Sequence, residues 1–212
     1  LEVLSPAGDY ERLISAIDYG ADAVYLGRKE FGMRASPLNF SYEELKSAVE
    51  IAHKKGVKVY LTCNTLPRNN EISEFQAFIE EVVDCEVDAV IVADIGVLSL
   101  VKKFAPNMEI HMSTQTGVVN YVTANELYNM GAKRVVLARE LSLEEIAEIR
   151  AKVPDDLDIE VFVHGAMCVS FSGRCLLSQY MVNRDANRGD HPHTPTPHNC
   201  KWKQPAGRER GE

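Results

Sequence analysis

Seven short apolar runs recur along the chain, and a segment of mixed polarity follows each of them except the last. Most runs are near-continuous Val, Ile and Leu, which is typical of parallel strands buried on both faces. The runs span residues 2–7, 23–27, 57–64, 89–94, 109–114, 134–140 and 159–165. This pattern predicts a parallel sheet.

The segments between the runs carry the spacing of amphipathic helices. Two of them place apolar side chains three and four residues apart, at Leu45, Ala48, Val49 and Ala52 and at Phe75, Phe78, Ile79 and Val82. Capping boxes of the form Ser-x-x-Glu begin at Ser41 and Ser142. Glycines that suit a left-handed residue after a helix follow at Gly20, Gly56 and Gly131.

Alternating strands and helices in units of roughly 20–30 residues predict an α/β fold. Both a doubly wound sheet and a (β/α)8 barrel fit this order. The barrel is favoured because the units are even, and because "SPAGDYE" after the first strand is neither a dinucleotide-binding loop nor a P-loop. An eighth strand is not visible, so we expect a TIM-barrel-like parallel (β/α) barrel that is incomplete in this chain.

The formal net charge of −8 argues against a uniformly basic surface for nucleic acid. A local basic patch stays open, with candidates Arg28, Lys29, Arg34, Arg174, Arg184 and Arg188. No apolar run reaches 18 residues, and the first residues do not resemble a signal peptide. The five cysteines are an odd number, which favours a reducing compartment. We therefore expect a cytoplasmic protein without a membrane span.

The composition changes after Asp190, where "HPHTPTPHN" is rich in Pro and His. Such a segment forms neither helix nor strand. The expected division is a barrel domain over residues 1–190 and a disordered or degenerate tail over 191–212. The chain does not begin with Met, so a fragment or a trimmed chain is expected.

Polar residues follow the predicted strands at their carboxyl ends, where parallel barrels place their functional sites. The expected substrate pocket is lined by Arg34, Asn64, Ser113, Gln115 and Glu140. Candidate catalytic residues, chosen because they can donate, accept or transfer protons at this edge, are Gln115, Glu140 and His164. Exposure of strand ends to water is an equally good explanation for any one of them.

Two cysteines, Cys168 and Cys175, follow the last predicted strand. A metal or cluster site, a thiol nucleophile activated by His164, a disulfide and ordinary packing all remain open. Six intervening residues are too many for a usual zinc knuckle but suit the looser spacing of an iron–sulfur cluster. Further ligands would come from Cys200, His191, His193 or His198. Cys63 and Cys85 lie in apolar patterns and are expected to be packed thiols.

The stretch "EVFVHGAMCVSFSGRCLLS" at 160–178 resembles the signature of the collagenase-like peptidases of unknown catalytic type, peptidase family U32. That signature is Glu-x-Phe, two residues, Gly-Ala-Met-Cys, four residues, Gly-x-Cys, one residue and Leu-Ser, and every position matches. Upstream stretches such as "FGMRASPLNFSYEEL" and "HMSTQ" also resemble the family. The resemblance covers residues 1–190.

The resemblance implies a TIM-barrel-like domain and a historical peptidase or collagenase activity without agreed catalytic residues. It also implies RNA as a partner, since members similar to the tRNA hydroxylation proteins introduce a 5-hydroxyl at the wobble uridine with prephenate as a required metabolite. Several members hold a [4Fe–4S] cluster, whose first two ligands correspond to Cys168 and Cys175. The family usually has a third cysteine after Gly-Asp, where this chain has His191. A truncated, non-catalytic remnant is therefore an alternative.

Overall fold

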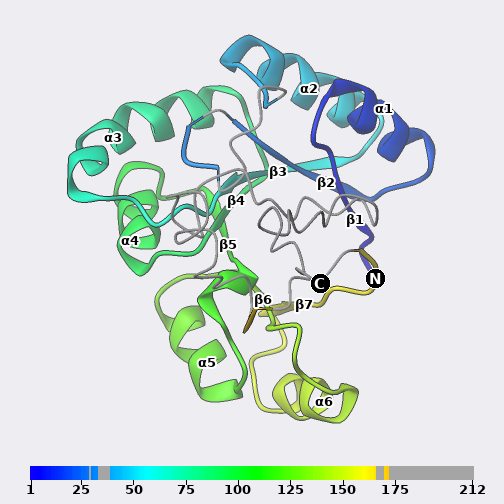
Figure 1. The fold of residues 1–212 in the computed structure, drawn as a ribbon, viewed down its shortest axis with the longest axis vertical. Helices are drawn as coiled ribbons and strands as arrows, with labels where there is room; N and C mark the ends of the chain where they lie inside the picture. The colour runs from blue at the N-terminus through cyan, green and yellow to red at the C-terminus, as the bar shows by residue number, and fades with distance from the viewer. Residues whose placement is uncertain (29, 33–38, 166–169, 172–212) are drawn as a thin grey trace, which may run out of the picture.

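The computed structural model describes residues 1–28, 30–32, 39–165 and 170–171, and within them seven strands form one parallel sheet in sequential order. The sheet curls into a half-barrel, with the helices on its outer face (Figure 1). The strands are β1 (Leu4–Pro6), β2 (Ala23–Gly27), β3 (Lys58–Cys63), β4 (Ala89–Val92), β5 (Glu109–Met112), β6 (Arg134–Val136) and β7 (Asp158–Glu160). The predicted parallel, incomplete barrel is confirmed.

A helix lies between each pair of consecutive strands. These are α1 (Tyr10–Asp18), α2 (Tyr42–Lys54), α3 (Asn69–Asp84), α4 (Ile95–Phe104), α5 (Tyr121–Asn129) and α6 (Leu143–Ala151), with a short 3-10 helix η1 (Thr114–Thr116) before α5. The two amphipathic patterns read from the sequence are the buried faces of α2 and α3. Within the described residues no helix is long and apolar enough to cross a membrane.

The two faces of the sheet carry different side chains. Val59 and Leu61 of β3 and Val90 of β4 point toward the helices and are fully buried in the main core. Tyr60 and Ala89, on the other face, belong to a smaller core cluster inside the half-barrel. This division follows from the period of two along a strand. The outer layer is apolar, whereas the inner layer mixes apolar and polar groups.

Both predicted capping boxes are present. The Ser41 hydroxyl accepts a hydrogen bond from the Glu44 amide, and the Glu44 carboxylate accepts one from the Ser41 amide. Ser142 and Glu145 make the same pair of bonds at the start of α6. Gly56, which follows α2, has a φ of +73°, in the left-handed region that favours glycine.

The last two strands are shorter than predicted. The apolar run 134–140 forms a strand only as far as Val136, and the chain then turns toward α6. Among the described residues β7 pairs with β6 alone, and this ladder also ends early, at Glu160. Val161 and Val163, predicted to be strand residues, are 38% and 90% exposed. The boundary between a domain at 1–190 and a tail at 191–212 lies outside the described residues and stays a prediction.

Replacing Ser41 by Ala should destabilise the protein by about 1 kcal/mol, because the amide of Glu44 then loses its side-chain acceptor. In a chain of this size the melting temperature should fall by about 2–4 °C. Ser41→Asn keeps an acceptor at the same position and should retain most of the stability. Thermal unfolding followed by circular dichroism measures both variants, and equal losses would contradict the role of the cap.

Candidate functional site

Because all seven strands are parallel neighbours, their carboxyl ends lie along one edge of the half-barrel. Asn64 follows β3, Ser113 follows β5, and Gln115 lies in η1 just beyond it. Glu140 and His164 lie in the segments after β6 and β7 and are exposed. The structure thus places these five predicted residues beyond carboxyl ends of strands, while their role as site residues stays a prediction.

Hydrogen bonds join the loops at this edge. The Ser113 hydroxyl accepts from the Gln115 amide at 3.3 Å and begins η1. Thr114 donates from its hydroxyl to the Leu137 carbonyl at 3.0 Å, which connects the loop after β5 to the loop after β6. Thr65 donates in the same way across the sheet, to a carbonyl in the loop after β2. The edge therefore offers neutral donors and acceptors on a cross-linked set of loops.

Two charged residues near this edge have structural partners. The Asp94 carboxylate accepts from the Val97 amide at 3.0 Å and caps α4. Arg28, suggested above for a basic patch, is only 6% exposed, and its guanidinium lies 2.7 Å from Glu81. The idea that Arg28 presents a free charge to RNA is therefore wrong, because α3 covers and neutralises it.

Several predicted site residues lie outside the described residues, namely Arg34, Cys168, Cys175, His191 and Cys200. Among the residues that are described, no group of three or more His, Cys, Asp or Glu is arranged to hold a metal ion.

Cys63 and Cys85 are buried and free, as predicted. Burial raises the pKa of the Cys63 thiol to about 12 and also raises the pKa of Cys85. Thiolates are the form that binds iron or attacks a substrate. Neither of these two cysteines is therefore suited to nucleophilic catalysis.

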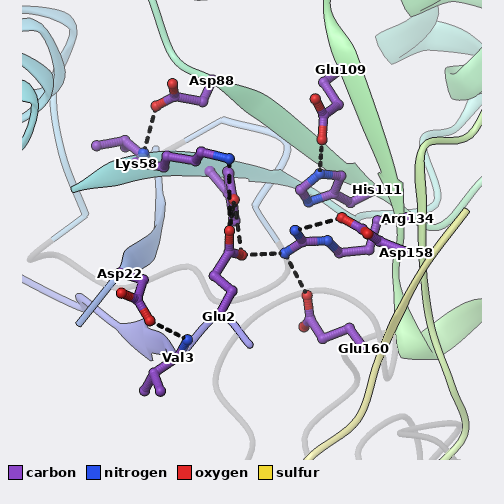
Figure 2. A network of polar contacts seen from close by, with 12 residues as sticks. Glu2, Val3, Asp22, Lys58, Asp88, Glu109, His111, Arg134, Asp158 and Glu160 are labelled. Atoms are coloured by element: carbon purple, nitrogen blue, oxygen red, sulfur yellow. Dashed lines mark hydrogen bonds and ion pairs between the residues drawn. The ribbon is translucent and has the colours of Figure 1, made fainter. Parts of the chain in front are cut away.

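A second polar group lies inside the half-barrel near the amino ends of the strands (Figure 2). Arg134, the first residue of β6, is 7% exposed, and its guanidinium lies 2.5 Å from the Glu2 carboxylate. The same group lies 3.0 Å from Asp158 and 3.4 Å from Glu160. The Tyr60 hydroxyl donates to Glu2 at 3.0 Å, and its ring faces Arg134.

His111 of β5 extends this inner network. Its side chain is fully buried, and its Nε2 lies 2.9 Å from the Glu109 carboxylate. The imidazole packs edge-on against the Tyr60 ring, with 4.6 Å between the ring centroids. Its Nδ1 has no hydrogen-bond partner among the described residues.

The environment shifts the pKa values of the carboxyl groups in this network in opposite directions. Burial raises the pKa of Glu160, against the attraction of Arg134. Burial also acts on Glu2, but the hydrogen bond and charge of Arg134 outweigh it and lower the pKa of that carboxyl. The hydrogen bond from His111 is the main cause of the lowered pKa of Glu109.

The sequence analysis assigned no role to these inner residues. The signal was present in the strands themselves, since polar residues alternate with apolar ones in Glu109-x-His111 and Asp158-x-Glu160. A period of two places such residues on one face of a strand. Here that face is the inside of the half-barrel.

The model of peptidase family U32 matches residues 8–203, which is nearly the whole chain. The chain belongs to peptidase family U32. The resemblance inferred from the cysteine-containing signature is thereby confirmed, although the name of this family does not by itself establish a catalytic mechanism.

Curated relatives carry two kinds of name. The chain is 42% identical to the tRNA hydroxylation protein P of Haemophilus influenzae, covering 95% of this chain and 43% of the relative. It is 46% identical to an uncharacterized protease of Methanocaldococcus jannaschii, covering 96% and 49%. It is 41% identical to a 23S rRNA 5-hydroxycytidine synthase of Escherichia coli, covering 90% and 28%. The chain spans less than half the length of these U32 relatives.

A solved U32 peptidase has the same fold. It superposes with a TM-score of 0.63 at 19% identity, covering 74% of this chain and 67% of the other. At this level of identity the likeness supports the curled parallel sheet with outer helices, and nothing about activity.

Replacing Glu160 by Gln should stabilise the protein at pH 8. Its folded pKa is raised above the ordinary 4.5, so ionisation costs stability as the pH rises through the folded value. The gain should shrink toward pH 4.5, where the wild-type carboxyl is protonated. Urea unfolding at several pH values measures the difference.

The matched variant is Glu109→Gln, which should act with the opposite sign. Its pKa is lowered by His111, so its stabilising effect is present above the ordinary value and disappears as the pH falls through the folded value. If both variants destabilise the protein at pH 8, burial is not the main influence on the pKa of Glu160.

Proposed function

We propose that this U32 chain is part of an RNA-modifying protein that hydroxylates a pyrimidine base, and that its substrate is the tRNA wobble uridine, as the family resemblance implies. The identity of 42% over 202 residues to a tRNA hydroxylation protein carries this proposal. The 41% identity to an rRNA hydroxycytidine synthase supports the same type of product on a different RNA. The proposed location is the cytoplasm, where tRNA is found.

An iron–sulfur cluster is the cofactor we propose for this reaction. Cys168 and Cys175 would be its first two ligands, with His191 or Cys200 as further ligands. When bound, such a cluster supplies one-electron transfer. Cys63 and Cys85 are buried and, within the described residues, belong to no group of metal-ligating side chains. Prephenate is proposed as a required metabolite.

The carboxyl edge of the half-barrel is the proposed substrate site. Asn64 and Ser113 are buried at this edge and Gln115 is half-buried, and their neutral polar groups are of the kind that suits the edges of a base. Glu140 and His164 are exposed and able to exchange protons with a bound substrate. Arg34 belongs to the same proposed pocket by its place in the sequence after β2.

Peptidase activity is a second candidate, because the 46% identical relative is named a protease. A thiol peptidase requires a cysteine of low pKa beside a base. Cys63 and Cys85 do not meet this requirement, so a thiol nucleophile would have to be Cys168, Cys175 or Cys200. Cleavage of gelatin by cluster-free protein would favour this candidate over RNA hydroxylation.

Replacing Cys168 by Ala, in a full-length version with the family's cysteines restored, should abolish both the absorbance near 400 nm and RNA hydroxylation. The reason is the loss of a cluster ligand. Iron content and the 5-hydroxyuridine content of tRNA, measured by mass spectrometry, check the two effects. Cys85→Ala is the control and should keep both. A Cys168→Ala protein that retains its iron and its activity would show that the cysteine pair is structural.

Glu140→Gln should lower the rate of RNA hydroxylation by about 100-fold if this carboxylate transfers a proton. Its melting temperature should change little, since the residue is exposed and surface interactions contribute little to stability. Glu144→Gln, at an exposed position in the first turn of α6, removes the same charge nearby and should keep full activity. Equal activity of both variants would remove Glu140 from the site.

A further inference from the structure

The first and last strands of the described sheet are joined by side chains. The strand order runs from β1 to β7, and within the described residues no ladder pairs these two strands with each other. Glu2 lies two residues before β1, whereas Arg134 begins β6 and contacts both ends of β7. The contact between Glu2 and Arg134 spans 132 positions of the chain.

We propose that Glu2, Arg134, Asp158 and Glu160 form an ionic clasp that closes the amino end of the half-barrel and fixes β7 relative to β1. The proposal rests on the fold and is independent of RNA hydroxylation. It gives the residues at the start of the chain a role in holding the strand that leads to His164.

Burial shows which contacts of the clasp matter most. The Arg134 side chain is 8% exposed, and those of Glu2 and Glu160 are 25% and 22% exposed. Asp158 is 59% exposed, so its pair with Arg134 is well screened by water. A buried guanidinium that loses its carboxylates is left uncompensated, which is strongly unfavourable. The link from Arg134 to Glu2 is therefore the central part of the clasp, because Glu2 lies closest to the guanidinium, at 2.5 Å, whereas Glu160 lies at 3.4 Å.

Tyr60 of β3 supports the clasp from inside the half-barrel. Its hydroxyl lies 3.0 Å from each oxygen of the Glu2 carboxylate. The Arg134 guanidinium lies 5.3 Å from the centroid of the Tyr60 ring, within the range of a cation–π contact. Lys58 adds a longer ion pair to Glu2 at 3.8 Å. Glu2 is thus held from two directions, and Figure 2 shows it between β3 and Arg134.

The strand β7 is the element most dependent on this clasp. It has three residues and pairs only with β6 within the described sheet. A strand with one neighbour and a short ladder opens more easily than a central strand. The strand β4, paired on both sides and fully buried, is the natural comparison.

The experiment is amide hydrogen exchange followed by mass spectrometry on the full-length protein. Glu2→Gln should speed exchange of residues 158–160 about tenfold, with no change at residues 89–92. Arg134→Met should produce a larger effect in the same segment. Lys133→Met is the matched control: it removes a positive charge next to Arg134, but from an exposed pair with Asp156, and should change nothing at β7.

The result that overturns the clasp is equally specific. Faster exchange after Glu2→Gln that is confined to the residues beside β1, or equal effects of Lys133→Met and Glu2→Gln at β7, would refute it. If Arg134→Met does not fold, Glu2→Gln and its Lys133→Met control decide the question. If Glu2→Gln leaves amide exchange at residues 158–160 unchanged, the clasp is contradicted, whatever happens to RNA hydroxylation. A change in RNA hydroxylation alone would bear only on the proposed function.

Discussion

When both faces of a parallel sheet are covered, its polar side chains can lie in two locations. One is the concave inner face of the curled sheet, and the other is the ends of the strands. In this protein the helices take the apolar face, where Val59, Leu61 and Val90 are fully buried. The inner face carries Arg134 and His111, both almost completely removed from water. Their burial is tolerable because carboxylates contact both of them, and the contact between Arg134 and Glu2 requires the sheet to curl.

The apolar pattern was enough to predict the sheet. Near-continuous Val and Ile runs, capping boxes at Ser41 and Ser142, and glycines after the helices all indicated local structure that the fold contains. These signals act over a few residues, so a single sequence carries them. The ends of β6 and β7 were predicted too long, because the length of a ladder depends on its neighbour.

The inner network could not be predicted in the same way. Glu2 and Arg134 lie 132 positions apart, and nothing in either local sequence indicates the other. Alternation identifies the face that a residue occupies, but the partner across the half-barrel depends on how strongly the sheet curls. For the candidate site, Asn64, Ser113 and Gln115 each follow a strand in the sequence, and this was enough to place them at the carboxyl edge. The chemistry there is beyond what position alone can establish.

Buried arginines lie near both ends of the half-barrel, and carboxylates neutralise them at each end. At the amino end, charges neutralise one another inside the protein, as the contacts of Arg134 show. Arg28, beyond the carboxyl end of β2, is likewise neutralised, by Glu81 of α3. Neither guanidinium is therefore available to phosphates, and the chain carries a net charge of −8. If the chain acts on RNA as proposed, the substrate would have to be held by other cations, and the carboxyl edge would contribute hydrogen bonds to a base. Such an arrangement would favour recognition of an unpaired nucleotide over general attraction to the RNA backbone.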